Sequence, residues 1–319
     1  MSYYRLKKLM EEIMKNIEEL FKFVKWAMIY DKTEAKKAGE DAVCYFGLSD
    51  KDICVNILNW NYDLNKNKNK KVLRGKIDML SELNPDFLVL QECSYHESIF
   101  FTKYFKYVKW YGDGKDGIYG ICVLSNKFDL KIIRYDIYEQ KFRYVVPYEL
   151  TINGIAILLL AIWTKDYLHT GKYFPWENVK DNVHCLSYTE NIVEAFKFYD
   201  DLLKNYSDAI IVGDFNSFDK KDERREEQID IVNRFKLYDI FNCSCFPGYS
   251  FPDGKSFETE VTFYHNKNDP DKTGTNDYCF LKKSENVVPF RFGIGYPAEW
   301  LKYSDHLPLW IELGVKKPN

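Results

Sequence analysis

The chain has 319 residues, 46% of them hydrophobic and 29% charged, and a formal net charge of -3. This length and apolar content allow a sizeable core, in one large domain or in two. No continuous apolar stretch is long enough to span a bilayer. The slightly negative charge excludes a molecule-wide basic footprint for nucleic acid, so any nucleic-acid contact has to be local.

The first predicted element is a long amphipathic helix over residues 4–29, with apolar residues at helical spacing and Lys and Glu between them. Its polar face mixes both charge signs, which favours packing on the main domain over an interfacial position on a membrane. The other interpretation is an arm that dimerises or binds a protein partner. Residues 31–51 form a polar connector, so we expect an N-terminal unit over residues 1–51 and a main domain over residues 52–319.

From residue 53 the pattern alternates between strands and helices. In chain order we expect a strand over 53–60, a helix over 73–83, strands over 87–91, 120–124, 131–138, 144–152 and 155–163, a helix over 189–205, a strand over 209–213, a helix over 229–235, and strands over 261–263, 277–281 and 307–313. The dipeptide Asn153-Gly154 predicts a type I′ hairpin turn. Strands with interspersed helices and hairpins predict two packed mixed sheets flanked by helices.

The eight cysteines lie mostly in apolar runs, and no CxxC motif is matched by a second ligand pair; they are Cys44, Cys54, Cys93, Cys122, Cys185, Cys243, Cys245 and Cys279. This pattern predicts buried free thiols rather than disulfides or a zinc site. Four glutamates interrupt any apolar core of a secretory signal near the N-terminus, namely Glu11, Glu12, Glu18 and Glu19. We therefore expect a cytoplasmic protein.

Five short polar clusters follow or interrupt apolar runs along the chain. They are LNWN at 58–61, LVLQE at 88–92, IIVGDFNS at 210–217, TNDYCF at 275–280 and YSDHLPLW at 303–310. Each places carboxylate, amide or imidazole groups where a strand ends, which is where a sheet presents chemistry to solvent. Taken singly, an Asp-His pair is more often structural, and GDFN is compatible with a strand followed by an Asx turn. Their joint occurrence predicts one site assembled from five segments.

The residue types in these clusters suit a metal-assisted reaction. Glu92 follows a fully apolar strand, where a carboxylate can hold a hard divalent cation together with waters, and Asn61 can add an amide oxygen. Asp214 and Asn216 are one residue apart and point to one side, which suits a general base and an amide that orients water. Asp305 and His306 offer a carboxylate and a protonatable donor, able to bind metal and to stabilise charge on a phosphate.

The order and spacing of the clusters resemble the endonuclease/exonuclease/phosphatase superfamily, which contains exonuclease III-type enzymes and deoxyribonuclease I, over residues 55–313. The resemblance rests chiefly on GDFN together with SDH, with support from LQE, the first strand ending in Asn, and NDY. It implies an α/β (α+β) fold, a four-layer αββα sandwich of two mixed β-sheets flanked by helices, here with an N-terminal helical extension. Residues 52–319 would then be the catalytic domain.

The resemblance also implies a metal site and a cofactor. Glu92 would be the principal Mg²⁺ ligand, with Asn61 and Asp305 nearby, and Mn²⁺ would be a possible substitute. The reaction would be hydrolysis of a phosphodiester or phosphomonoester by in-line attack, with the ion stabilising charge on an oxygen.

Four further residues would carry the acid–base chemistry by the same resemblance. Asp214 would activate the attacking water, and Asn216 would orient it. His306 would bind the scissile phosphate and stabilise its developing charge, while Asp277 would orient and polarise the imidazole.

One segment departs from the family pattern. Many members carry a catalytic His at the end of a central strand, in a segment similar to NTHL, whereas AIWT in this chain places Trp163 there. AP endonuclease members also lack that His, so the departure leaves activity possible and leaves the leaving-group acid open. His169 and His184 stand in polar loops, where surface histidines are expected. A metal-bound water, Tyr119 or Tyr167 are the alternatives.

Two features bear on the substrate. The run KNKNKK at 66–71, joined by Arg74 and Lys76, is either a patch that contacts a phosphate backbone or a solvated loop. The segment 104–119 gathers aromatic side chains that form either a base-stacking surface or core, namely Tyr107, Trp110, Tyr111 and Tyr119.

These observations favour a Mg²⁺-dependent nuclease acting on DNA or RNA, as a monomer or weak dimer. The alternative is a metal-dependent phosphatase or phosphodiesterase acting on a small-molecule or lipid-linked phosphoester. It is weakened because the chain has no counterpart of the inositol phosphatase segment similar to PAWCDR. A non-catalytic binding module is disfavoured because the metal and phosphate positions are retained.

Overall fold

The computed structural model describes residues 29–31, 52–63, 69–112, 119–133, 144–164, 188–216, 234, 237–239, 261–265, 273–282 and 284–317. The helix predicted over 4–29 and the connector over 31–51 lie almost entirely outside these residues. Of the helix predicted over 229–235 only Arg234 is described, and it is helical. None of the helices in the described part of the chain is long and apolar enough to cross a bilayer.

Two mixed sheets form the body of the protein. In the described residues the first sheet has the strand order β1-β14-β15-β2-β3-β5-β4 and the second has the order β10-β13-β9-β8-β7-β6. The first contains β1 (Ile29–Asp31), β2 (Ile53–Asn61), β3 (Phe87–Gln91), β4 (Tyr107–Gly112), β5 (Gly120–Ser125), β14 (Val287–Gly295) and β15 (Leu309–Val315). The second contains β6 (Lys131–Ile132), β7 (Val145–Ile152), β8 (Ile155–Trp163), β9 (Asp208–Asp214), β10 (Leu237–Asp239) and β13 (Asp277–Lys282).

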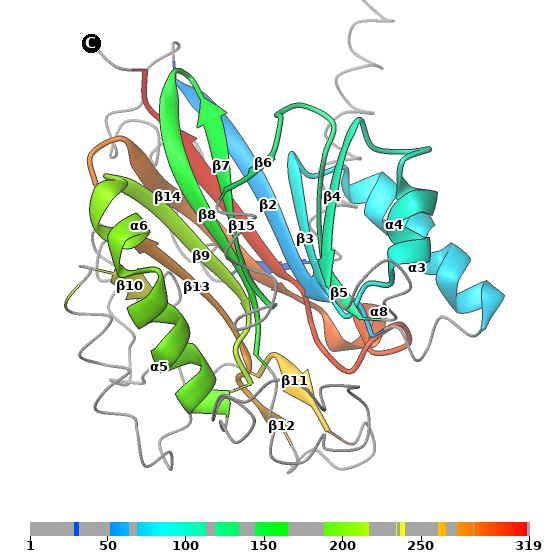
Figure 1. The fold of residues 1–319 in the computed structure, drawn as a ribbon. Coiled ribbons are helices and arrows are strands. Elements are labelled where there is room, and N and C mark those ends of the chain that lie inside the picture. The colour runs from blue at the N-terminus through cyan, green and yellow to red at the C-terminus, as the bar shows by residue number, and fades with distance from the viewer. Residues whose placement is uncertain are drawn as a thin grey trace, which may run out of the picture.

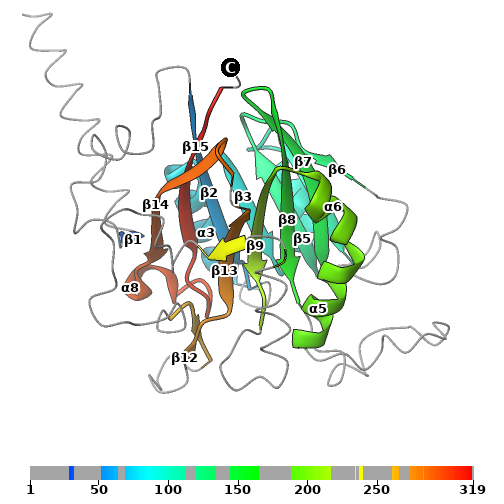
Figure 2. The same cartoon turned by 90° about the vertical axis from the view of Figure 1, so that its left-hand side faces the viewer.

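Helices cover the outer faces of both sheets. Figure 1 shows α3 (Lys70–Leu83) and α4 (Tyr95–Phe101) beside the first sheet, and α5 (Tyr188–Phe198) and α6 (Asp200–Asn205) beside the second. The short α8 (Pro297–Trp300) precedes β15, and β11 (Phe263–Tyr264) pairs with β12 (Thr273–Gly274). Both views place this small hairpin at one end of the sandwich, near the ends of β9 and β13 (Figure 1, Figure 2). The predicted four-layer αββα sandwich is confirmed.

Local sequence explains where several of these elements begin and end. Asn69 caps α3 by accepting a hydrogen bond from the Lys71 N–H, and the helix ends at Asn84, which is left-handed and precedes Pro85. The β7–β8 turn has positive φ at both Asn153 and Gly154, as a type I′ turn requires. The predicted hairpin is therefore confirmed.

The sequence missed some elements of the first sheet. Residues 29–31 were assigned to the N-terminal unit, yet they pair with β14, so this part of the segment 1–51 belongs to the sheet. The strand β14 was not predicted because it contains Pro289 and an irregularity between Pro289 and Arg291. The helix α4 was also missed, although Ser94 and Glu97 form a capping box that marks its start.

Two other differences concern single elements. The helix predicted over 189–205 divides at Tyr199, whose hydroxyl donates to the Val145 carbonyl oxygen at 3.0 Å and so holds the chain against β7. The strand predicted over 131–138 is described only at 131–132, because residues 134–143 lie outside the described part.

Candidate active site

The predicted site residues converge at one edge of the sandwich. The parallel pairs β2–β3 and β8–β9 end together there, which places Asn61, Glu92 and Asp214 at neighbouring strand ends. Asp277 begins β13 directly opposite Asp214, because β13 runs antiparallel to β9. His306 lies in the segment that leads into β15 and forms a bridge with Phe263.

Asp214 is buried and held by three hydrogen bonds. Its Oδ1 accepts from the Asn216 N–H at 3.0 Å, and its Oδ2 accepts from Nδ2 of Asn216 at 3.0 Å and from Nδ2 of Asn61 at 2.9 Å. The Asx turn that GDFN suggested is thus present, with Asn216 at a φ of 48°. The turn holds the Asp214 carboxylate in one orientation, and this structural role is compatible with a chemical role for the same group.

Asn216 is oriented by two residues that the sequence analysis had not singled out. Its Nδ2 also lies 3.1 Å from the Thr164 carbonyl oxygen, and its Oδ1 accepts from Nδ2 of Asn276 at 3.3 Å. Asn276 stands in the cluster TNDYCF, next to Asp277, so the sequence already indicates that it lies near the site. Thr164 follows Trp163 at the end of β8, where nothing in the local pattern marks it.

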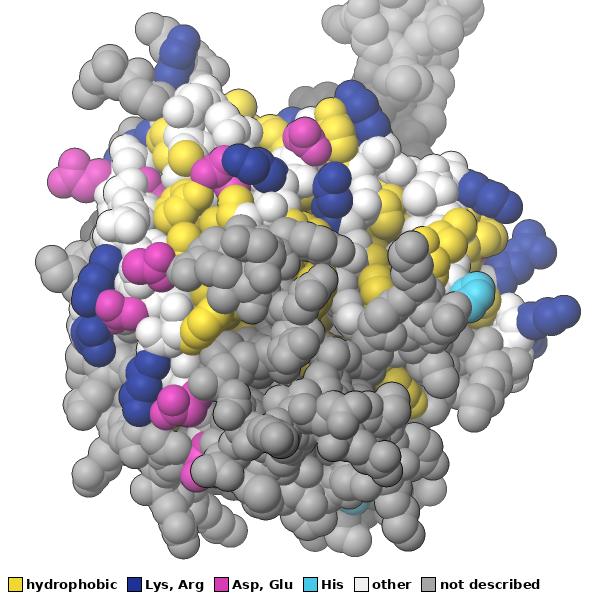
Figure 3. Space-filling view, in the orientation of Figure 1, with side chains coloured by type: hydrophobic (Ala, Val, Ile, Leu, Met, Phe, Trp, Pro, Cys, Tyr) yellow, Lys and Arg dark blue, Asp and Glu magenta, His cyan; other side chains and the backbone are white. Residues whose placement is uncertain are grey.

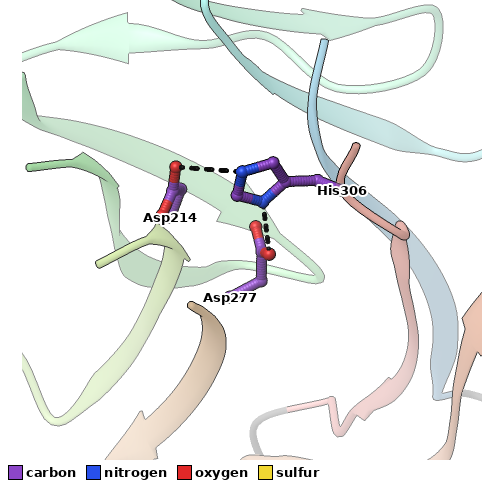
Figure 4. Close-up of side chains that lie close together, drawn as sticks. All are labelled: Asp214, Asp277 and His306. Atoms are coloured by element: carbon purple, nitrogen blue, oxygen red, sulfur yellow. Dashed lines mark hydrogen bonds and ion pairs between the residues drawn. The ribbon is translucent and has the colours of Figure 1, made fainter. Parts of the chain in front are cut away.

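His306 lies between two buried carboxylates (Figure 4). Its Nδ1 is 2.8 Å from Oδ2 of Asp277, and its Nε2 is 3.8 Å from Oδ2 of Asp214. Among the described residues, these three have ligand atoms within 4.8 Å of one another. Both ring nitrogens thus face a carboxylate in this arrangement. Oδ1 of Asp277 is buried without a hydrogen-bond partner among the described groups.

The backbone around His306 is also fixed. Ser304 Oγ accepts from the His306 N–H at 3.1 Å and donates to the Asn61 carbonyl oxygen at 2.8 Å. Nε1 of Trp60 donates to the His306 carbonyl oxygen at 3.0 Å. The ring of Phe263 lies 4.7 Å from the imidazole. The imidazole is therefore tied to β2 and to the β11–β12 hairpin.

Burial and mutual charge shift the pKa values of these groups. Burial raises the pKa of Asp214 to about 7, with a further rise from Asp277 and opposing effects of His306 and Asn61. Burial alone would lower the pKa of His306, but the carboxylates of Asp277 and Asp214 raise it to about 10. At neutral pH the imidazole is therefore positively charged, and Asp214 is poised to exchange a proton.

Glu92 stands at the start of a second, more acidic part of the site. It has a φ of 53°, and its Oε1 accepts from Nδ2 of Asn61 at 3.1 Å. Burial raises its pKa, Asn61 and His306 lower it, and the negative charges of Asp63 and Asp305 raise it. These carboxylates repel one another when they are ionised. A divalent cation bound between them would relieve that repulsion, so the group suits a metal site.

Asn61 connects the two parts of the site. Its oxygen accepts from the Asp63 N–H at 3.1 Å, while its nitrogen faces both Glu92 and Asp214. In this arrangement Asn61 orients the carboxylates, and a role as metal ligand through its oxygen stays a prediction. Asp305 is half-buried, with its Oδ1 3.5 Å from Ser304 Oγ. Asp63, which the sequence analysis did not single out, joins them because the turn after β2 is left-handed at this residue.

The position of Lys76 differs from the one that the sequence predicts. The sequence groups Lys76 with the basic run at 66–71, whereas in the structure its side chain is fully buried. Its Nζ donates to the carbonyl oxygens of Tyr62 and of Asp63, the latter at 3.1 Å, and lies 4.3 Å from the centre of the Tyr62 ring. Lys76 therefore fastens the turn that carries Asn61 to helix α3. Arg74 is exposed, and residues 64–68 lie outside the described part.

Trp163 ends β8 in register with Asp214 and is 4% exposed. Its ring packs 4.8 Å from that of Tyr144 and 5.9 Å from that of Tyr119. Packed aromatic rings thus stand at the position where, by the family resemblance, many members of the superfamily carry a His. The alternative acids His169, His184 and Tyr167 lie outside the described residues.

Comparison with known proteins agrees with this geometry. The family described as "Endonuclease/Exonuclease/phosphatase family" matches residues 61–306. The chain belongs to the endonuclease/exonuclease/phosphatase family. Members of this family hydrolyse phosphoric esters with the help of a divalent metal ion, and the chain is accordingly a metal-dependent phosphoric-ester hydrolase. No curated protein sequence matches the chain significantly.

Solved structures of this family share the fold at low sequence identity. D. rerio TDP2 complexed with single-strand DNA product is 16% identical, with 82% of this chain and 99% of that chain covered and a TM-score of 0.52. ANGEL2, a 2',3'-cyclic phosphatase, is 14% identical over 84% and 97% of the two chains, with a TM-score of 0.53. The human Nocturnin catalytic domain with bound sulfate anion is 14% identical over 83% and 96%, with a TM-score of 0.52.

Proposed function

We propose that the protein is a Mg²⁺-dependent phosphodiester hydrolase that cleaves nucleic acid, DNA or RNA, with Mn²⁺ as a possible substitute. The observation that carries the proposal is the bridge that Asn61 forms between Glu92 and Asp214, beside the His306–Asp277 pair. This bridge joins the acidic site for a cation to the proposed general base, Asp214. The positively charged imidazole of His306, proposed to bind the phosphate, lies beside it.

In this proposal Asp214 accepts the proton of the attacking water. Its raised pKa of about 7 makes it a stronger base than an exposed aspartate, so it takes the proton near neutral pH. Nδ2 of Asn216 and Nδ2 of Asn61 hold the carboxylate in place, and the Asn216 amide is positioned to orient the water. Because both amides are themselves fixed by the backbone, little reorganisation is needed during the reaction.

The imidazole of His306 binds the phosphate and offsets the charge that develops on it. Its Nδ1–H is held by Asp277, which leaves Nε2–H directed towards the Asp214 side of the site. A protonated imidazole in a buried position stabilises an anion more strongly than it would in water. Asp277 thus keeps His306 both charged and correctly oriented.

The cation would be held by Glu92 and Asp305, with Asp63 and Asn61 beside them. When bound, it supplies Lewis-acid stabilisation of a phosphate or leaving oxygen. The hydrogen bond from Asn61 orients one oxygen of Glu92 and leaves the other for a ligand. This supports a cation with oxygen ligands, of which Mg²⁺ is the common case.

Nucleic acid is the substrate class that the family comparison favours. The structure of D. rerio TDP2 contains a single-strand DNA product, and that of ANGEL2 is described as a 2',3'-cyclic phosphatase with adenosine-2',3'-vanadate. Both ligands are nucleic-acid or nucleotide esters, which supports such a substrate here over a lipid-linked phosphoester. We also propose a cytoplasmic location, with support from Cys93 and Cys122, which are buried free thiols.

The first test is a time course of supercoiled plasmid conversion by the purified protein in Mg²⁺ or Mn²⁺. Single-stranded DNA and RNA oligonucleotides serve as parallel substrates, with EDTA and the variants Asp214→Asn and His306→Ala as controls. We expect metal-dependent cleavage of at least one nucleic acid that both variants lose while their thermal unfolding stays cooperative. Cleavage of small phosphoesters alone would move the function to the phosphatase alternative.

A further inference from the structure

An unusual exposed surface lies on α4 and the following edge strand β4. Few large hydrophobic side chains are exposed among the described residues, yet Ile99 is 50% and Tyr104 47% exposed. They lie within six residues of each other, at the end of α4 and in the turn after it. Figure 3 shows hydrophobic side chains over this part of the molecule bordered by Lys and Arg. We call Ile99, Lys103, Tyr104, Lys106 and Tyr107 the α4–β4 surface.

Basic and aromatic residues alternate in the sequence from this surface into β4. Lys103, Lys106 and Lys109 stand beside Tyr104, Tyr107 and Trp110 in the sequence. Nζ of Lys103 lies 5.3 Å from the ring centre of Phe100, and Nζ of Lys106 lies 4.8 Å from that of Tyr107. These two ammonium groups therefore lie over rings, and both rings, Phe100 and Tyr107, are half-exposed.

Lys103, Lys106 and Lys109 form no ion pair with a carboxylate of the described residues. Several other lysines of the described chain do form such pairs, as in Lys127–Asp86, Lys131–Glu149, Lys197–Glu194, Lys204–Asp200 and Lys302–Glu299. Among the described residues no carboxylate lies within ion-pair distance of Lys103, Lys106 or Lys109. The nearby Glu97 instead accepts hydrogen bonds from Ser94 at the start of α4. The negative charge of Asp129 acts on Lys106 without forming an ion pair with it, so the charge of the three lysines is compensated only in part.

Trp110, on the face of β4 opposite to Tyr107, ties this strand to the candidate metal site. Nε1 of Trp110 donates to the carbonyl oxygen of Cys93 at 2.8 Å, and Cys93 directly follows Glu92. A Cβ atom on Gly112 or Gly120 would come within 2.6 Å of the indole, so glycines at both positions let it lie close to the strands. Because β4 begins at Tyr107, the strand that Trp110 fixes beside Glu92 starts at the α4–β4 surface.

We infer that the α4–β4 surface binds a single-stranded segment of nucleic acid next to the scissile site. Lysines without ion pairs attract a polyanion, and the exposed ring of Tyr104 and the half-exposed ring of Tyr107 offer faces on which unstacked bases can lie. A duplex keeps its bases stacked on one another, so the rings favour a single strand. The inference rests on the proposed function, to which it adds the form of the substrate and the path that its flanking nucleotides follow.

The experiment measures binding of a fluorescein-labelled oligo(dT) by anisotropy in EDTA, where no cleavage occurs. The test variant is the full chain with Lys103→Gln, Lys106→Gln and Lys109→Gln, and a second variant carries Tyr104→Ser. The matched control removes the same charge elsewhere, with Lys197→Gln, Lys204→Gln and Lys302→Gln. All these side chains are exposed or half-exposed, so cooperative unfolding should be retained, and circular dichroism checks it.

We expect the lysine variant to bind at least about tenfold more weakly, and the slope of log K against log salt to fall by about 2, as loss of about three phosphate contacts predicts. Tyr104→Ser should weaken binding about tenfold with an unchanged salt slope, because stacking carries no counterion release. The control should bind like the wild type. Equal losses in test and control variants, or no loss in either, would overturn the assignment of this surface.

Two further measurements separate this inference from the proposed function and from other partners. Hydrolysis of bis(p-nitrophenyl) phosphate should be the same in the wild type and in all these variants, because the substrate is too small to reach the surface. If the wild type cleaves oligonucleotides and the lysine variant cleaves and binds them equally well, only the surface assignment fails. Variants that lose binding to anionic vesicles while oligo(dT) binding persists would mark a lipid-binding surface and refute the inference.

Discussion

Nδ2 of Asn61 lies 2.9 Å from Oδ2 of Asp214, so an amide at the end of β2 holds a carboxylate at the end of β9. The two residues belong to different sheets, and the same amide nitrogen also lies 3.1 Å from Glu92. One neutral group therefore sets the spacing between the proposed base and the proposed metal ligand. Its removal should disturb both at once.

Asn61→Leu should lower kcat/KM about 100-fold or more, because a hydrogen bond to a charged group contributes about 1.5–3 kcal/mol and two are lost. The variant should also need more metal for half-maximal activity. Steady-state kinetics across a Mg²⁺ titration measures both effects. The control is Asn59→Leu, because Asn59 is equally buried but hydrogen-bonds Gln91 at 2.8 Å instead of a carboxylate. Similar losses in the two variants would argue against a specific role for Asn61.

The pH dependence of kcat/KM should be bell-shaped. The rate should rise with pH through about 7 as Asp214 loses its proton, and fall near pH 10 as His306 loses its proton. A cation beside Glu92 favours ionised Asp214 and moves the acidic limb to lower pH. In Asp277→Asn the alkaline limb should shift downward, because burial lowers the pKa of His306 and Asp277 is the largest influence opposing it. NMR titration of the His306 ring checks the assignment, and an unmoved alkaline limb would contradict it.

Glu92 has a left-handed backbone conformation, and its carboxylate is repelled by those of Asp63 and Asp305. Both features lower the free energy of unfolding in the absence of metal. Glu92→Gly should raise the free energy of unfolding by about 1 kcal/mol without metal, because glycine adopts a positive φ at no steric cost and the repulsion with Asp63 and Asp305 is removed. Glu92→Gln keeps the backbone and removes only the charge. Both variants should lose the stabilisation that Mg²⁺ gives to the wild type in thermal melts. A variant that is still stabilised by Mg²⁺ would exclude Glu92 as the main ligand.

Lys76→Met should lower stability by about 2 kcal/mol or more, because the carbonyl oxygens of Tyr62 and Asp63 lose a buried donor. The loosened turn should also weaken metal binding through Asn61 and Asp63. Chemical denaturation and Mn²⁺ binding followed by electron paramagnetic resonance measure these effects separately. Lys197→Met is the matched control, because Lys197 is exposed and pairs only with Glu194 within α5. An unchanged Mn²⁺ affinity in Lys76→Met would show that Lys76 acts on stability alone.

The seven site residues proposed from the sequence lie at one edge because each stands next to the end or start of a strand. Glu92 and Asp214 end parallel strands that point the same way, and Asp277 begins the strand opposite Asp214. The pattern of apolar runs encodes such positions directly. The same rule explains why β3 and β8 have the predicted bounds.

Other parts of the site depend on contacts that no local pattern encodes. Asp63 enters the acidic group through a left-handed turn, and Lys76 is buried because α3 packs over that turn. A lysine within a polar run is expected on the surface, and only the tertiary contact with Tyr62 and Asp63 reverses that expectation. The edge strand β4 was missed for a related reason, since its half-exposed residues show no clear alternation.

The order of the site residues along the chain has a consequence for synthesis. Asn61 and Glu92 are made early and Asp214 in the middle, while the imidazole that completes the centre lies at position 306. A nascent chain on the ribosome therefore lacks the proposed phosphate ligand until translation has passed His306. By the reaction proposed above, hydrolysis cannot begin until nearly all of the sandwich has been synthesised.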